Sequence, residues 1–210
     1  AKSMSNYGIM LMRGEGVSLN KREAARYIEM AAKRGDKSGM LNYGIILRKG
    51  GCGIAVDKSK AARYVKMALD EGNDEAALFY ADMLRKGEGV PINKREAGRY
   101  FKISADKGNK YSMLFYADML RKGEGVPSDK SEAAKYYKMA AKKGNAHAMN
   151  SYAVMLRTGE GVEIDKGKAA RYFKISAEKG NQNAMFNYAD MLRKGEGVAV
   201  NMEEAARYFK

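Results

Sequence analysis

The chain contains little of the chemistry on which most catalytic and metal-binding sites depend. Its 210 residues include one cysteine, Cys52, one histidine, His147, two prolines and no tryptophan. A single cysteine excludes a disulfide within the chain, and a single histidine excludes metal motifs built on two histidines. It also disfavours a Ser-His or Cys-His nucleophile. We therefore expect no enzyme activity, no catalytic residue, no cofactor and no metal site.

Long apolar stretches are also missing, although 45% of the residues are hydrophobic. Without about 18 consecutive apolar residues, no membrane span is expected. The chain opens directly inside a patterned segment, with no signal peptide in view. We expect a cytoplasmic protein, while secretion or an organelle stays open because flanking segments could carry a leader. The apolar residues are mostly Met, Ala, Tyr and Leu, which favours helices over strands.

What the chain does contain is one pattern written six times with a period of 36 residues. Three copies share the identical run YADMLRKGEGV, at Tyr80 to Val90, Tyr116 to Val126 and Tyr188 to Val198. A fixed period of this size predicts a stacked-repeat solenoid with one continuous core. We place the six repeats of this single 1–210 domain at 1–36, 37–73, 74–109, 110–145, 146–181 and 182–210.

Each repeat is predicted to hold two helices. In the fourth repeat the first helix covers Lys110 to Lys122, with apolar residues at helical spacing. A Tyr followed by Gly or Ala, and a Leu four residues after the Tyr, recur in all six copies and mark the core. The second helix begins after an Asn or Asp N-cap and ends at a glycine such as Gly144. Glu three residues after the cap, present in four copies, suggests a capping box.

The second repeat departs from this pattern, because its connector, Gly50-Gly51-Cys52-Gly53, is one residue longer than the usual Gly-Glu-Gly-Val. We interpret it as a widened loop. Both ends of the chain cut through the pattern without a polar capping repeat. We therefore expect a fragment of a longer array, or ends that allow copies to stack end to end.

The recurring Tyr-Ala/Gly-x-Met-Leu-x-x-Gly-Glu-Gly-Val run and the later Ala-x-x-Tyr-Phe resemble the Sel-one-like repeat (SLR) family, a relative of tetratricopeptide repeats. The resemblance covers essentially the whole chain, with Tyr where the family usually has Trp. It implies an all-α, right-handed α/α superhelix whose first helices line a concave groove. It also implies a non-catalytic scaffold or adaptor that binds a peptide or protein surface, and it names no individual partner.

If the first helices line a groove, their polar stripe is the candidate binding site. Aromatic side chains on such a stripe are typical anchors, and arginines could pair with a peptide carboxylate. The candidate partner-binding residues are Phe79, Asp82, Arg85, Lys86, Tyr111, Phe115, Asp118, Arg121, Lys122, Asn187, Asp190 and Arg193. The alternative is that the Asp and Lys residues neutralise each other as i,i+4 pairs and that Phe79 and Phe115 pack between repeats.

Two other functions stay open. The net charge is +14, and lysines such as Lys130, Lys135, Lys138, Lys142 and Lys143 recur along the second helices. This basic face could bind nucleic acid or another polyanion, although no nucleic-acid recognition motif accompanies it. The array could also be a passive spacer in a longer protein. The Gly-x-Gly loops lack the third glycine and the preceding strand of a dinucleotide site.

Overall fold

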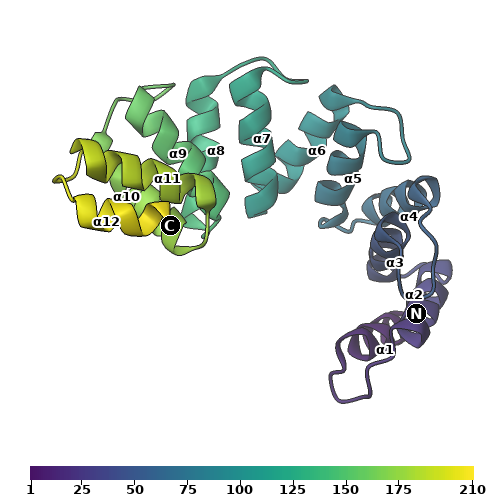
Figure 1. Ribbon diagram of the computed structural model, residues 1–210. Coiled ribbons are helices and arrows are strands. Elements are labelled where there is room, and N and C mark those ends of the chain that lie inside the picture. Colours follow the sequence, from purple (N-terminus) through teal and green to yellow (C-terminus); the bar gives the residue numbers. More distant parts are fainter. The chain divides into compact units, whose positions relative to one another are not determined.

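The computed structural model describes residues 1–210 and is all helical, as predicted (Figure 1). Its only β-type contact is an isolated bridge between Gly51 and Ile54. No helix is both long and apolar enough to cross a membrane. The twelve helices are α1 (Lys2–Arg13), α2 (Lys21–Lys33), α3 (Lys37–Lys49), α4 (Lys58–Asp70), α5 (Ala76–Lys86), α6 (Lys94–Asp106), α7 (Lys110–Lys122), α8 (Lys130–Lys142), α9 (Ala146–Thr158), α10 (Lys166–Glu178), α11 (Gln182–Lys194) and α12 (Met202–Phe209).

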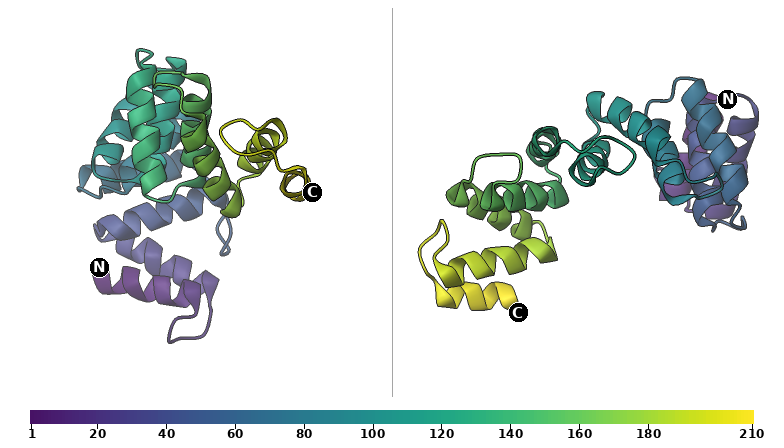
Figure 2. Two further views of the ribbon diagram at one scale, coloured as in Figure 1. Left: turned by 90° about the vertical axis from the view of Figure 1, so that its left-hand side faces the viewer. Right: turned by 90° about the horizontal axis from the view of Figure 1, so that it is seen from above.

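The chain divides into two compact units, Ala1–Ser104 and Ala105–Lys210, with the boundary inside α6. In the first unit α1 to α4 each pack against the next helix of the chain, and α7 to α11 do the same in the second (Figures 1 and 2). Odd-numbered helices are the first helices of their repeats and even-numbered helices are the second. Packing between chain neighbours is the solenoid arrangement that the period predicted.

The second helices begin at the predicted N-caps. The side chain of Asn20 accepts a hydrogen bond from the backbone N–H of Glu23 at 3.1 Å, and the other five repeats repeat this bond. The expected return bond of the capping box is different. The backbone N–H of Asn20 donates to the carbonyl of Leu11, so Glu23 accepts instead from the side-chain amide of Asn20. The cap residue thereby also closes the connector onto the first helix.

The core forms where the two helices of a repeat meet. In every repeat the tyrosine of the first helix contacts a tyrosine of the second edge-to-face, as Tyr43 and Tyr64 do at 4.9 Å. The small residue after that tyrosine is required by close approach: a Cβ on Gly44 would lie 2.7 Å from Val65. Tyr7, expected in the core, is 37% exposed because α1 lacks the preceding second helix that covers its equivalents.

The connectors hold one repeat against the one before it. Their glycines adopt positive φ, which disfavours other residues. At Gly89, Gly161 and Gly197, the second glycine of the Gly-Glu-Gly-Val run lies so close to the preceding second helix that an added Cβ would overlap the backbone where that helix begins. The predicted wider loop of the second repeat instead carries Cys52 at a φ of 59° and is closed by the bridge between Gly51 and Ile54.

Candidate interaction surface

The sequence-predicted residues lie on three first helices, α5, α7 and α11. Within each unit, we call the side that carries them its first-helix face. Exposure on it varies: Tyr111, Lys86, Lys122 and Arg193 are exposed, Asp82 is only 9% exposed, and the other seven are half-buried. The helices that carry them belong to different units, so each group is described within its own unit.

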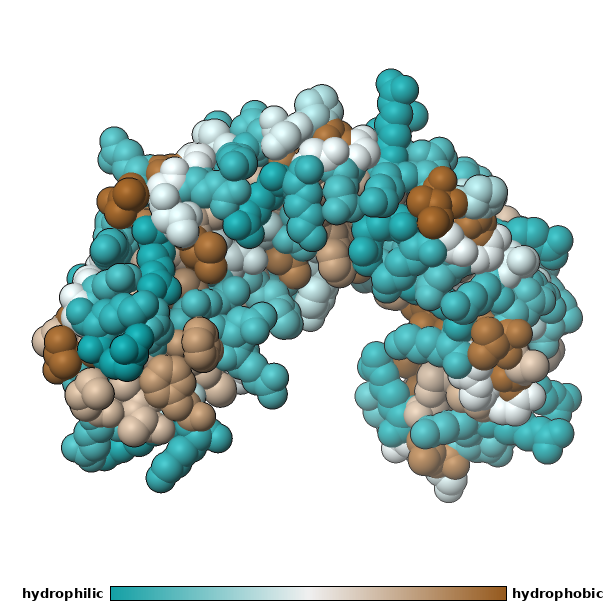
Figure 3. Space-filling model, turned by 45° about the horizontal axis from the view of Figure 1, so that its top comes forward, coloured by the Kyte–Doolittle hydropathy of each residue, from teal (hydrophilic) through white to brown (hydrophobic).

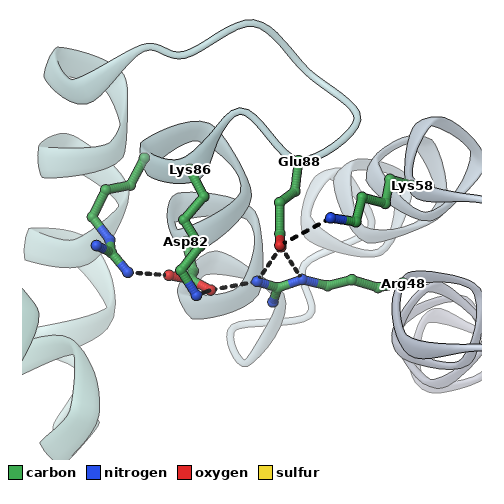
Figure 4. A network of polar contacts seen from close by, with 6 residues as sticks. Arg48, Lys58, Asp82, Lys86 and Glu88 are labelled. Atoms are coloured by element: carbon green, nitrogen blue, oxygen red, sulfur yellow. Dashed lines mark hydrogen bonds and ion pairs between the residues drawn. The ribbon is translucent and has the colours of Figure 1, made fainter.

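Asp82 is the centre of a network of ion pairs in the first unit (Figure 4). Its carboxylate accepts hydrogen bonds from Arg85 and Lys86 of its own helix, and from Arg48 of the preceding repeat. Arg48 also pairs with Glu88 in the connector, which Lys58 contacts at 3.3 Å. Burial works against ionisation of Asp82, but the hydrogen bonds from Arg48, Lys86 and Arg85 outweigh it and lower the pKa of this carboxyl.

The same arrangement recurs in the second unit. Arg157 pairs with Asp190 at 2.9 Å and with Glu196 at 3.0 Å, both in the following repeat. Arg121 pairs with Glu160 at 2.7 Å, and Lys130 contacts the same carboxylate. We call this recurring arrangement of arginine, connector glutamate and second-helix lysine the repeat clamp. Its arginine occupies a predicted partner-binding position, yet much of its hydrogen-bonding capacity is used to join repeats.

The sequence analysis missed the connector glutamate as a partner in this clamp, although the sequence carries a signal for it. Where the first repeat meets the second, Met12 stands at the arginine position and Cys52 at the glutamate position. Both charges are therefore lost together at one junction. This paired loss is what a direct contact between the two positions requires, because either charge alone would remain without its counterion.

Asp118 has a contact that no other repeat offers. The buried Tyr137 hydroxyl donates a hydrogen bond to its carboxylate. Burial, followed by the nearby charge of Asp118, raises the pKa of Tyr137. The equivalent residues in the other repeats are Ile28, Val65, Phe101, Phe173 and Phe209. The fourth repeat thus places one extra polar group in its core and ties it to the first-helix face.

The aromatic candidates differ in their accessibility. Tyr111 is 52% exposed at the start of α7, and the ammonium of Lys110 lies 5.4 Å from its ring centroid. Phe115, one helical turn later, is half-buried, as is Phe79 on α5. The sequence analysis missed Phe186 on α11, which is 62% exposed and contacts Phe209 edge-to-face at 5.7 Å. In the other repeats its position carries Ser, Leu or Asn, so no recurring pattern marked it.

Amide side chains connect the repeats at two further points of the second unit. Asn187, a predicted site residue, donates to the side-chain oxygen of Asn150 on α9 at 3.2 Å. The exposed His147 lies with its Nδ1 3.0 Å from the side-chain nitrogen of Asn181, the buried N-cap of α11. These contacts bring α9 and α11 side by side on the first-helix face.

The second helices differ from the first-helix face because they are strongly basic. Each of α2, α4, α6, α8 and α10 carries four Lys or Arg residues and only one or two acidic ones. Hydrophobic side chains on the face drawn in Figure 3 form small patches separated by hydrophilic residues. A cavity of about 410 Å³ lies beside α8 and α10, lined by Tyr152, Tyr172, Lys138 and Lys168 together with the connector at 162–165. No group of three or more His, Cys, Asp or Glu side chains gathers to hold a metal ion.

Comparison with known proteins accounts for this architecture. The family model described as Sel1 repeat matches residues 1–36, 37–73, 74–109, 110–145, 146–181 and 182–210. A search of curated proteins finds no match. Among solved structures, a protective antigen present in uropathogenic Escherichia coli strains, displaying an SLR fold, is 26% identical with a TM-score of 0.89. That alignment covers 99% of this chain and 44% of the antigen, so this chain spans less than half of its length.

Two further structures support the fold. A Sel1 repeat protein from Oxalobacter formigenes is 24% identical with a TM-score of 0.89, covering 99% of this chain and 83% of that one. An immunity protein from Pseudomonas aeruginosa is 19% identical with a TM-score of 0.60, covering 99% of this chain and 78% of that one. At these identities the likeness shows the fold alone.

Proposed function

Because the chain belongs to the Sel1 repeat family over its whole length, we propose that it acts as a scaffold that binds a protein partner along the first-helix face. Sel1 repeat proteins are generally protein-interaction scaffolds and typically non-catalytic. The finer parts of the proposal are the face that binds and the residues that contact the partner. We assign both to the first helices, with a peptide or a protein surface as the occupant.

One observation carries this assignment: α7 presents Tyr111 and Phe115 one turn apart on the first-helix face, with Tyr111 52% exposed. A large aromatic side chain offers extensive contact area at a small cost in conformational entropy, which makes it a typical anchor. Phe79 offers the same chemistry on α5. The aromatic residues are therefore the primary contacts in the proposal.

The charged residues have a second, supporting role. Asp82, Arg121 and Asp190 are held in ion pairs between or within repeats, so a partner that removed these pairs would lose as much as it gained. Lys86, Lys122 and Arg193 remain exposed and can donate to carboxylates or carbonyl groups of a partner. Asp118 and Asn187 complete the polar part of the face, and Arg85 lies beside Asp82. The polar residues then fix the register of a segment that the aromatic residues anchor.

The test is capture of partners from nuclease-treated extract of the native cell, with mass spectrometry as the readout. The variant is Phe79→Ala, Tyr111→Ala, Phe115→Ala. A matched control replaces three exposed apolar residues outside the first-helix face, Ile92→Ala, Ile164→Ala and Val200→Ala. Loss of a captured protein with the variant but not with the control supports the proposal. Equal capture by wild type and the aromatic variant would exclude these residues as the anchors.

A further inference from the structure

The second helices carry two rows of residues that recur in every repeat from the first to the fifth. The basic row consists of one exposed cation per helix: Arg26, Arg63, Arg99, Lys135 and Arg171. The aliphatic row lies four residues later, one turn along the same helices: Met30, Met67, Ile103, Met139 and Ile175. Residues four apart are neighbours on a helix surface, so each basic residue lies beside an aliphatic one. We propose that within each unit these rows form a second protein-binding surface, for a partner segment that carries acidic and bulky apolar side chains side by side.

The aliphatic row is exposed to an extent that the fold does not require. Its five side chains are between 39% and 45% exposed, whereas Ile28 and Val65 of the same helices are fully buried. Several other exposed aliphatic residues have a structural explanation. Ile92 and Ile164, just before the second helices, pack over the glycines that end the first helices. The Met and Ile side chains of the aliphatic row do not cover a glycine in this way.

The basic row is not paired within salt-bridge distance in this structure, although Arg171 lies near enough to Asp165 for its charge to add to the effect of Lys168 in lowering the pKa of this carboxyl. None of its five members forms an ion pair, in contrast to Arg48, Arg121 and Arg157 on the first helices. Those three arginines form the ion pairs of the repeat clamp, whereas the side chains of the basic row are exposed to solvent. With a net charge of +14 for the whole chain, this surface is electrostatically matched to an acidic partner.

Duplication of an ancestral repeat does not by itself explain why the two rows recur. It would also have preserved the neighbouring positions on the same face of the helices, and these vary. The residue four before the basic row is Arg22, Ser59, Arg95, Ser131 or Gly167, and the residue three after the aliphatic row is Lys33, Asp70, Asp106, Lys142 or Glu178. Charge, polarity and size all change at these positions. The two rows keep their chemical type while their surroundings do not.

The chemistry of the rows favours a protein segment over other anionic partners. A guanidinium group pairs with a carboxylate in a bidentate geometry, and a neighbouring Met adapts to varied apolar side chains. Binding of single-stranded nucleic acid relies on aromatic stacking as well as charge, and neither row contains an aromatic residue. Insertion into a membrane surface uses protruding Trp, Phe or Leu, whereas these Met and Ile side chains are more than half covered.

The test uses the intact chain and defined probes. The main probe is a fluorescein-labelled helical peptide of about 18 residues with Glu and Leu on one face at i,i+4 spacing. Two matched peptides replace either Leu by Ser or Glu by Gln, and an oligonucleotide of similar charge serves as a polyanion. Fluorescence anisotropy is measured at about 0.1 M salt, where charges at the surface are partly screened. We expect the Glu-Leu peptide to bind with a Kd below about 100 µM and the other three probes to bind at least about fivefold more weakly.

Three variants separate the rows from general charge. The first is Arg26→Glu, Arg63→Glu, Arg99→Glu, and the second is Met30→Ser, Met67→Ser, Ile103→Ser. The control reverses three exposed lysines outside the rows, Lys2→Glu, Lys49→Glu and Lys179→Glu. Circular dichroism establishes that each variant folds. We expect each row variant to weaken binding by about tenfold or more and the control by less than about threefold.

Several outcomes would overturn the inference. The first is that the Glu-Leu peptide does not bind with a Kd of about 100 µM or less. The second is that the row variants and the control variant lose the same affinity. The third is that the oligonucleotide binds as tightly as the peptide. Because the residues of the basic row are exposed, their variant keeps the test valid if the serine variant is unstable. Because the rows are separate from the first-helix face, the variant of Phe79, Tyr111 and Phe115 should bind the peptide normally. Failure here would therefore leave the proposed function untouched.

Discussion

Replacing Arg48 by Met, the residue that the first repeat carries at this position, should weaken the junction between the second and third repeats. The Arg48 side chain is 16% exposed and contacts Asp82 and Glu88, which are 13% and 23% exposed. Removing one partner of a fully buried ion pair costs about 3–5 kcal/mol. Here Asp82 keeps Arg85 and Lys86, and Glu88 keeps Lys58. We therefore expect the free energy of unfolding to fall by about 1–2 kcal/mol.

The measurement is urea unfolding at pH 7 followed by circular dichroism, as a double-mutant cycle of Arg48→Met and Glu88→Gln. Residues in direct contact should show a coupling energy of about 1 kcal/mol. A repeat array need not unfold in one step, so hydrogen exchange of the α3 and α5 amides gives a local second reading. Purely additive effects, or a change below about 0.3 kcal/mol for Arg48→Met, would refute the clamp as a source of stability.

The pH dependence supplies an independent check of the same reasoning. Burial opposes ionisation of Asp82 and Glu88, but the hydrogen bonds and charges of Arg48 and the neighbouring cations together outweigh it, so the pKa values of both carboxyls are lowered. A carboxyl whose pKa is lowered in the folded state adds stability above its unfolded pKa, which is about 4, and loses it as the pH falls through the folded value. The difference between wild type and Arg48→Met should therefore shrink below about pH 4. A difference that stays constant down to about pH 2 would contradict this assignment.

The remaining predictions concern the connectors and the tyrosines. Gly161→Ala should destabilise the protein by more than about 2 kcal/mol in thermal unfolding, because the new Cβ would overlap the backbone of Lys130. Gly180→Ala has open space around it and should cost only about 1 kcal/mol, which comes from the positive φ of this residue. Equal costs for the two variants would contradict the close approach at Gly161. Tyr137→Phe should cost about 1 kcal/mol by the same assay, since it removes the hydrogen bond to Asp118, and a neutral result would mean that the hydroxyl contributes nothing. Burial raises the pKa values of Tyr80, Tyr137 and Tyr152, so the stability they add is complete below the unfolded pKa of about 10 and declines as the pH rises above it. Tyrosinate absorbance should then appear together with unfolding in an alkaline titration, and its appearance in the folded protein would contradict the shift.

Much of the fold could be predicted from the sequence because the period repeats each local signal six times. The N-caps, the C-terminal glycines and the small residue after each tyrosine are local requirements, and each is met as predicted. The capping box was wrong in its return bond, because the backbone N–H of Asn20 is taken by the carbonyl of Leu11. That contact depends on how the connector folds back onto the first helix. Residue preferences at helix ends carry no information about this path.

The candidate site was harder to predict, since the sequence shows which residues share a helix face but not which partners they have. In the sequence, Arg121 and Asp82 look like residues available to a partner. The three-dimensional structure shows that Arg121 contacts Glu160 and that Asp82 contacts Arg48. Those partners lie between 34 and 39 residues away in the sequence. The replacement of both charged residues at one junction, the arginine by Met12 and the glutamate by Cys52, was the one signal of this contact within the chain. Tyr111, by contrast, is an exposed aromatic side chain, and its role as a binding anchor stays a prediction.

The most direct test of the central claim is a hydrogen-exchange footprint of the chain in complex with its captured protein partner. If the first helices bind the partner, amides of α5 and α7 should be protected in the complex relative to the free chain, and the variant of Phe79, Tyr111 and Phe115 should abolish this protection. Protection confined to the second helices, with α5 and α7 unchanged, would contradict the proposed function and place the partner on the basic and aliphatic rows instead.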